Sequence, residues 1–248
     1  MNLAPALAER RIAFRNGQLA AIAATAEQSG ATALHITGSL GRQEDDALSD
    51  VDAWLTFPDD AIDAVVRDRL DLYRELGEIL LIHEAINNRP VGGVYSLVLY
   101  QSEAGPMMVD WALAPQRTSS VVPPMKTVYE RVPVLRVSHF SRRQIDSTAQ
   151  PVFTLDERVT WLTCMLFVTI KMIVRGKDRG FLSFLEGGYR DVRDTYGLDG
   201  IAATSPTSLP NVSIMLRQLI PYARDEQRRA IEAIDAFLRE LAETWLPH

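Results

Sequence analysis

The chain has a single cysteine among its 248 residues, Cys164, and it lacks any long hydrophobic run. One cysteine excludes a disulfide framework within the chain and a cysteine-rich zinc site. No stretch approaches about 18 consecutive uncharged apolar residues, the length that would predict a membrane span. The first residues reach charged side chains too early for a signal peptide. We therefore expect a soluble, cytoplasmic protein with no membrane partner, in which Cys164 is a buried small hydrophobe.

Positive charge is also in short supply. The chain has 26 Lys and Arg against 32 Asp and Glu, a formal net charge of −6. Proteins that wrap nucleic acid usually carry a basic excess or a basic stripe, so the acidic balance argues against a nucleic-acid partner. It does not exclude a nucleotide ligand, because one phosphate site needs only a few local cations. A hydrophobic share of 47% is typical of a globular protein that buries a core.

Hydrophobic periodicity predicts an α/β first part and an all-α second part. We expect residues 1–135 to form an α/β (α+β) domain with a mixed sheet, and residues 136–248 to form a C-terminal helical-bundle domain. Residues 115–150 are rich in proline, serine and threonine, which is the composition of a connector. The helices expected in the first part are 3–28 and 59–76, and its strands are 33–37, 50–57, 78–83, 94–100 and 107–113, the last two as a hairpin. The helices expected in the second part are 155–175, 181–196, 212–222 and 225–245.

Two acidic residues separated by one position begin the second expected strand. Side chains at alternate strand positions project from the same face, so Asp50 and Asp52 face one side while Val51 faces the other. Two like charges this close repel each other unless a cation lies between them. Mg²⁺ typically takes one or two carboxylates together with phosphate oxygens. Taken alone, the pair is more typical of a solvated strand start, and a magnesium site needs the support of further features.

Two further features accompany the acidic pair. Gly38 and Ser39 follow an apolar strand. A glycine at such a turn lets backbone N–H groups approach a phosphate, and the serine hydroxyl can donate as well. Asp110 lies in the apolar strand 107–113, where a carboxylate is costly unless it is paired, bound to a metal or at a rim. Each feature alone is compatible with ordinary surface structure, but together they favour one phosphoryl-transfer site.

The order of these features resembles a known superfamily. An apolar strand, GS at 38–39, DVD at 50–52, a helix and a later strand with Asp110 are similar to the nucleotidyltransferases typified by DNA polymerase beta. The run GSLGR…SDVD extends the likeness to the aminoglycoside and lincosamide adenylyltransferases. Residues 109–115 (VDWALAP) make it most similar to the streptomycin 6-adenylyltransferase type. The likeness covers residues 33–115, and over the helical half it is one of architecture.

The resemblance implies a mechanism with two magnesium ions and ATP as co-substrate. Asp50 and Asp52 would hold Mg²⁺ on the triphosphate, and Asp110 would complete a second metal position about 4 Å from the first. Ser39 and the backbone at Gly38 would bind the β- and γ-phosphates.

Four more residues are candidates by resemblance. Arg42 is an added phosphate contact, with a solvated turn arginine as the alternative. Glu84 is the candidate base for the acceptor hydroxyl, with Asp110 or a metal-bound species as the alternative base and a loop glutamate without a catalytic role as the other interpretation of Glu84. Lys171 interrupts an apolar helix and shares a face with Arg175 four residues later, so both are candidate triphosphate contacts from the helical domain. The alternative for Lys171 is a side chain that reaches the surface.

These observations predict transfer of AMP from ATP to a hydroxyl of a small acceptor, with release of pyrophosphate. The resemblance implies an aminoglycoside-like antibiotic as acceptor, and hence antibiotic resistance; a carboxylate-rich cleft would attract such a polycation. A protein acceptor, as in toxin–antitoxin pairs, and a catalytically silent nucleotide-binding module remain as alternatives. Extension of RNA ends is disfavoured by the acidic balance. The base of the nucleotide and the choice between monomer and dimer stay open.

Overall fold

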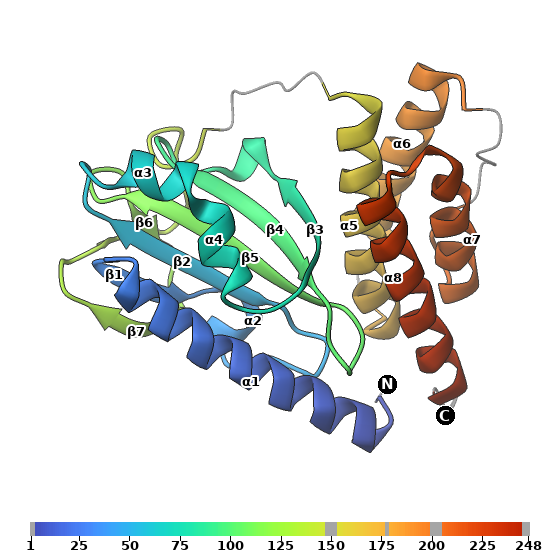
Figure 1. The fold of residues 1–248 in the computed structure, drawn as a ribbon, viewed down its shortest axis with the longest axis horizontal. Helices are drawn as coiled ribbons and strands as arrows, with labels where there is room; N and C mark the ends of the chain where they lie inside the picture. The colour runs from blue at the N-terminus through green and yellow to red at the C-terminus, as the bar shows by residue number, and fades with distance from the viewer. Residues whose placement is uncertain (1–2, 147–152, 177–178, 199–204, 245–248) are drawn as a thin grey trace. The chain divides into compact units, whose positions relative to one another are not determined.

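The computed structural model describes residues 3–146, 153–176, 179–198 and 205–244 (Figure 1). The chain divides into two compact units, which are described separately. One, called the sheet unit below, consists of Glu9–Ser102 and Met107–Pro151. The other, the helical unit, consists of Met1–Ala8, Glu103–Pro106 and Val152–His248. The domain boundary expected between residues 135 and 136 falls inside the sheet unit, because the backbone at 144–146 is hydrogen-bonded to residues 89–91.

A mixed six-stranded sheet forms the centre of the sheet unit. Its strands are β1 (Ala33–Ile36), β2 (Val51–Phe57), β3 (Ile79–Glu84), β4 (Val94–Tyr100), β5 (Met107–Pro115) and β7 (Lys126–Glu130). The strand order is β3-β4-β5-β2-β1-β7, with β2 and β5 parallel and every other neighbouring pair antiparallel. A separate parallel pair is formed by β6 (Ser120–Val121) and β8 (Leu135–Arg136). The predicted antiparallel pairing of β4 with β5 is confirmed, with Tyr100 opposite Met107.

One face of this sheet is covered by helices. These are α1 (Pro5–Gln28), α3 (Ile62–Arg67) and α4 (Arg69–Arg74), as Figure 1 shows. Alternate strand residues point toward them and are buried, among them Leu55 on β2 and Trp111 on β5. Tyr73 of α4 packs on Trp111 with ring centroids 5.2 Å apart, and its hydroxyl donates to Ser96 Oγ at 2.9 Å. Burial of each such large apolar side chain contributes about 1.5–3 kcal/mol. The intervening strand residues point to the opposite face.

Three parts of the sheet unit differ from the sequence prediction. Residues 115–150, expected to be a connector, contain β7, which pairs with β1 at the sheet edge. Most of β7 is exposed, so it lacks the apolar alternation that predicts a strand. The helix expected at 59–76 is two short helices that meet at Asp68. Gly38 and Ser39, expected in a tight turn, begin the one-turn helix α2 (Gly38–Gly41).

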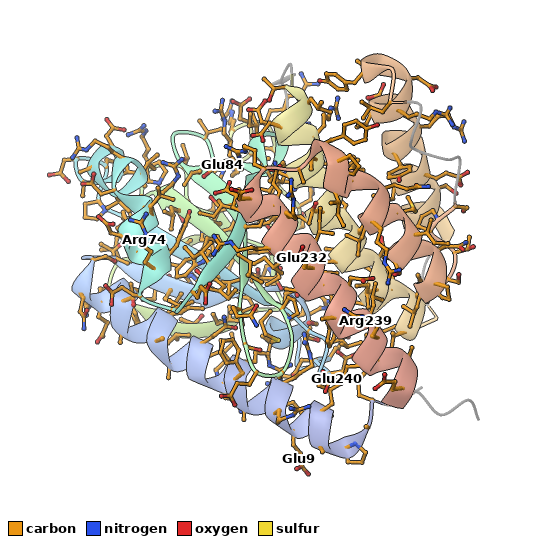
Figure 2. All side chains as sticks on the ribbon, turned by 45° about the vertical axis from the view of Figure 1, so that its right-hand side comes forward. Glu9, Arg74, Glu84, Glu232, Arg239 and Glu240 are labelled. Carbon is orange, nitrogen blue, oxygen red and sulfur yellow. The ribbon has the colours of Figure 1, made fainter. Side chains whose placement is uncertain are left out.

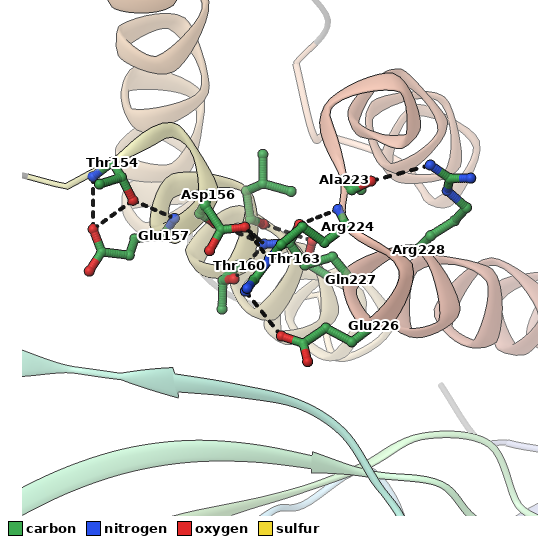
Figure 3. Close-up of polar contacts among 11 residues, drawn as sticks. Thr154, Asp156, Glu157, Thr160, Thr163, Ala223, Arg224, Glu226, Gln227 and Arg228 are labelled. Atoms are coloured by element: carbon green, nitrogen blue, oxygen red, sulfur yellow. Dashed lines mark hydrogen bonds and ion pairs between the residues drawn. The ribbon is translucent and has the colours of Figure 1, made fainter.

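The helical unit contains four α-helices close to those expected: α5 (Leu155–Val174), α6 (Arg179–Tyr196), α7 (Leu209–Leu219) and α8 (Asp225–Thr244). α5 begins at a capping box in which Thr154 Oγ1 accepts from the Glu157 N–H and Glu157 Oε2 accepts from the Thr154 N–H (Figure 3). Gln227 of α8 is fully buried and donates to Thr160 Oγ1 at 2.8 Å, which ties α8 to α5. None of the helices in the described ranges combines the length and hydrophobicity needed to cross a membrane.

Candidate active site

Two of the predicted site carboxylates lie side by side on the sheet. β2 and β5 are parallel neighbours, and their register places Asp52 directly beside Asp110. Asp50 precedes β2 by one residue. All three carboxylate residues are partly buried. The face that carries Asp52 and Asp110 is the one opposite α1, α3 and α4, because the residues on either side of them in β2 and β5 belong to the helix-covered core.

A tyrosine that the sequence did not single out lies against these acids. Tyr95 is on β4, and its hydroxyl donates to Asp110 Oδ2 at 2.9 Å. Burial, and after it the carboxylates of Asp110, Asp52 and Asp50, raise the pKa of the Tyr95 hydroxyl well above its usual range. The Tyr95 hydroxyl therefore interacts electrostatically with all three acids. The sequence predicts that Tyr95 lies on the strand VYSLVLY, but it does not predict which acids face Tyr95 across the sheet, because that depends on strand order and register.

Gly38 brings the backbone of the first motif against Asp52. The Thr37 N–H donates to the Asp52 carbonyl oxygen at 2.9 Å, which aligns the start of α2 with β2. Gly38 has φ +61°, a left-handed conformation that favours glycine. A Cβ built at Gly38 would lie 1.8 Å from Asp52 Oδ2. A residue with a Cβ at position 38 therefore requires the Asp52 carboxylate or the backbone to move. Ser39 follows Gly38 and is partly buried.

Two arginines that the sequence analysis did not predict contact the loop between Gly41 and Asp50. Arg11 and Arg15 of α1 are almost fully buried. Arg11 Nε donates to the Ala47 carbonyl oxygen at 2.9 Å, and Arg15 Nη2 donates to Asp45 Oδ2 at 2.7 Å. Both arginines therefore help to place the start of β2. The Asp45 carboxylate is thus ion-paired with Arg15.

Glu84 does not lie with the other acids. It ends β3 (Figure 2), opposite Ser96 on β4, and Ser96 is in turn opposite Trp111 on β5. Directly opposed residues share a face, so Glu84 lies on the helix-covered face and not on the face of Asp110. Its carboxylate accepts from Arg69 Nε at 2.9 Å. The role of Glu84 as general base stays a prediction that this placement does not favour.

The predicted cations lie in different surroundings. Arg42 pairs with Glu44 at 2.8 Å, and 43% of its side chain is exposed. Lys171 of α5 is buried, with Nζ 5.5 Å from the centre of the Phe167 ring. Arg175 ends α5 and is partly buried. Lys171 and Arg175 belong to the helical unit, so their roles toward the triphosphate stay predictions.

The carboxylates of Asp52 and Asp110 are candidate ligands for a magnesium ion. Within the described ranges, no group of three or more His, Cys, Asp or Glu side chains is arranged to hold a metal ion. The adjacent Asp52 and Asp110 supply the hard oxygen donors that Mg²⁺ prefers, and it commonly completes its shell with substrate phosphates and water. The close approach of Gly38 leaves backbone rather than a side chain beside Asp52. These residues fit a magnesium ion that shares its coordination with a phosphate.

A cavity of about 680 Å³ lies on the same face of the sheet as the acids. Its lining includes Trp54 of β2, Tyr95 of β4 and Phe140. Trp54 is two residues beyond Asp52 on β2, so the two side chains share a face. The volume is typical of a small-molecule site. The sequence did not predict it, because Phe140 and its neighbours fall in the stretch expected to be a connector or the start of the helical domain.

A buried histidine on this face makes stability depend on pH. His35 of β1 is fully buried, with Nε2 3.4 Å from Glu130 Oε2. Burial lowers the pKa of His35 below its usual 6.5, although Glu130 opposes the shift. The unfolded chain therefore binds a proton near pH 6.5 that the folded chain does not bind, so stability falls as the pH drops through 6.5.

We expect His35→Gln to flatten the pH dependence of unfolding. Denaturant titrations from pH 7.5 to 5.5 should show a smaller loss of unfolding free energy in this variant than in the wild type. His139→Gln, which changes an exposed histidine, is the matched control and should follow the wild-type curve. If the unfolding free energy of His35→Gln falls with pH as steeply as that of the wild type, His35 is not the group responsible for the pH dependence.

No protein-family model matches the chain, and no curated protein sequence matches it. The site is therefore interpreted from its own residues.

Proposed function

We propose that this protein is a magnesium-dependent nucleotidyltransferase that moves AMP from ATP to a hydroxyl of a small acceptor and releases pyrophosphate. The observation that supports it best is the adjacent pair Asp52 and Asp110 in register on parallel strands, with the Gly38 backbone against Asp52. Two carboxylates at this spacing repel each other in the absence of a cation. A phosphate-bound Mg²⁺ satisfies both. Because the donor is ATP, we place the reaction in the cytoplasm.

Each site residue has a role in this reaction. Asp50 and Asp52 would hold Mg²⁺ on the triphosphate, and Asp110 would hold a second ion. When bound, the metal supplies Lewis-acid stabilisation of the charge that develops on phosphate oxygens. Ser39 would donate to the β- or γ-phosphate from its hydroxyl. Tyr95 donates to Asp110 Oδ2 and so orients that carboxylate.

The bond changes are those of an in-line displacement. The acceptor oxygen forms a bond to the α-phosphorus, and the bond from that phosphorus to the bridging oxygen of pyrophosphate breaks. The hydroxyl proton passes to a base on the same face of the sheet. Asp110 lies on that face and Glu84 on the other, so Asp110 is the better placed of the two.

The experiment that tests this proposal uses ATP labelled at the α-phosphate. The protein is incubated with Mg²⁺ and a panel of aminoglycosides, lincosamides, flat-ring hydroxyl compounds and proteins. Transfer of label to a small molecule, abolished by EDTA, is the expected result. Label only on protein would support the toxin–antitoxin alternative. Magnesium-dependent ATP binding without transfer or hydrolysis would support a silent nucleotide-binding module.

We expect Glu84→Gln to retain activity. Loss of a general base typically costs about 10²–10⁴-fold in rate, and Asp110→Asn should show a loss of that size. Glu84→Gln removes only a partly exposed ion pair with Arg69, worth about 0–1 kcal/mol of stability. The measurement is kcat for both variants with the same acceptor. A Glu84→Gln loss as large as that of Asp110→Asn would restore Glu84 as the base.

A further inference from the structure

Two strands of the sheet contribute aromatic side chains to the cavity beside the acids, Tyr95 from β4 and Trp54 from β2. Both are register partners of Ala112 on β5, so the three residues form one row across the sheet. Ala112 itself is buried between them. The next row on this face contains Asp110 and Asp52, two residues away along the strands. Two strand residues span about 7 Å, so a molecule in the cavity lies within reach of the acids.

An aromatic pair forms one wall of this cavity. Trp54 and Phe140 are stacked, with ring centroids 5.2 Å apart and planes inclined by 11°. The indole is held in place, because Trp54 Nε1 donates to Ser119 Oγ at 3.0 Å and Ser119 Oγ also contacts Thr56 Oγ1 at 2.6 Å. Phe140 is 38% exposed, unusually open for a phenylalanine. Stacked rings, one of them open, form a surface that favours a flat ring.

Two further segments line the cavity and are joined to each other by main-chain and ionic contacts. Residues 139–142 and Ile145 line the cavity from one side, and Asn87 and Asn88 of the short 3-10 helix η1 (Ile86–Asn88) line it from another. Arg89 Nη2 donates to Asp146 Oδ2 at 2.6 Å, and the Asp146 N–H donates to the Arg89 carbonyl oxygen at 3.0 Å. These contacts join the segment that follows η1 to the segment that ends at Asp146. The side-chain amides of Asn87 and Asn88 can donate to and accept from the edge of a ring.

The charge of the lining decides against a polycation. None of the described residues that line the cavity is acidic, and Arg142 carries a permanent positive charge there. Asp146, next to the lining residue Ile145, is ion-paired with Arg89. Asp52 and Asp110 would be neutralised by magnesium in the proposed reaction. A polyamine acceptor would meet Arg142 without a carboxylate partner. A neutral or anionic ligand meets no such repulsion.

We propose that this cavity binds the acceptor of the transfer reaction, and that the acceptor carries a flat hydroxyl-bearing ring with no positive charge. The acceptor role rests on the proposed function; the preference for a flat ring rests on the cavity alone. The position favours acceptor over donor. Gly38 follows β1 and so lies on the β1 side of Asp52, whereas the cavity is lined by Trp54 of β2 and by Tyr95 of β4, on the other side of β5. An in-line displacement needs the attacking and leaving oxygens on opposite sides of the α-phosphorus.

Binding to the full-length protein tests the ring preference without catalysis. The probes are adenosine as a neutral flat ring, 4-hydroxybenzoate as an anionic one, and kanamycin as a polycation, each measured by isothermal titration calorimetry. We expect the flat probes to bind, and Phe140→Ala and Trp54→Ala to weaken them at least tenfold. Leu135→Ala, another exposed hydrophobic residue in the same unit, should leave binding unchanged. Arg142→Ala should weaken 4-hydroxybenzoate at least fivefold, and the neighbouring exposed Arg143→Ala should not.

Three results would overturn the inference: no binding of either flat probe, an unchanged affinity in Phe140→Ala, or kanamycin binding that depends on Phe140.

A competition experiment distinguishes an acceptor ring from the base of the donor nucleotide. The protein is preloaded with Mg²⁺ and a non-hydrolysable ATP analogue; we expect adenosine to bind as before. Displacement of adenosine would assign the cavity to the base of the donor and overturn the acceptor role. Intact flat-ring binding with no transfer to any compound would refute the proposed function while supporting the ring preference.

Discussion

Asp52→Asn is expected to abolish nucleotidyl transfer while preserving the fold of the metal-free protein. The activity falls because the variant loses a charged ligand for the metal and the phosphate. Several kcal/mol of charge stabilisation at 1.36 kcal/mol per factor of ten gives a loss of about 10³-fold or more. The fold survives because Asn has nearly the same shape and no longer repels Asp110, its partner in the register of β2 and β5.

Thermal unfolding with and without Mg²⁺ and an ATP analogue is the measurement. Binding only to the folded state at 100 times the dissociation constant adds about 2.7 kcal/mol of stability, so the wild-type melting temperature should rise. The Asp52→Asn melting temperature should not respond. Asp60→Asn, which changes an exposed carboxylate after β2, is the control and should respond as the wild type does. A magnesium response preserved in Asp52→Asn would refute the site.

Gly38→Ala is expected to destabilise the fold and to inactivate the enzyme. Two costs add at this position. The left-handed φ of +61° costs an alanine about 1–2 kcal/mol. The new Cβ would also lie 1.8 Å from Asp52 Oδ2, so the carboxylate or the start of α2 must move, and such overpacking costs about 1–3 kcal/mol more. Movement of either group displaces Asp52 from Asp110.

Gly30→Ala is a matched control for the backbone cost. Gly30 has φ +80° with no atom within 4 Å of a built Cβ, so alanine there carries the conformational penalty without the clash. Urea unfolding should show a loss for Gly38→Ala that exceeds the loss for Gly30→Ala, and only Gly38→Ala should lose transfer activity. Equal losses, or activity retained in Gly38→Ala, would show that the close approach to Asp52 has no functional role.

The local elements were largely readable from sequence because their signals are local. The apolar period of residues 155–175 predicts α5, alternation predicts β2, and two apolar segments around a turn predict the hairpin of β4 and β5. β7 was not predicted, because its side chains are mostly exposed and its partner β1 is about 90 residues earlier in the chain, so only tertiary pairing defines it. The two helices α3 and α4 were merged into one for a similar reason, since no glycine or proline marks the break at Asp68.

The candidate site also has some features that the sequence predicts and others that only the tertiary structure defines. From sequence alone, Asp50 and Asp52 share a strand face and Gly38 precedes them, because the two-residue period of a strand and the conformational freedom of glycine are properties of the local chain. Only the tertiary structure decided that Asp110 lies beside Asp52, that Tyr95 donates to Asp110, and that Glu84 lies on the other face. Strand order and register depend on pairings between distant segments, which no local pattern encodes. The cavity of Trp54 and Phe140 likewise exists only because residues 139–142 and Ile145, far along the chain from β2, fold back over the face of the sheet opposite α1, α3 and α4.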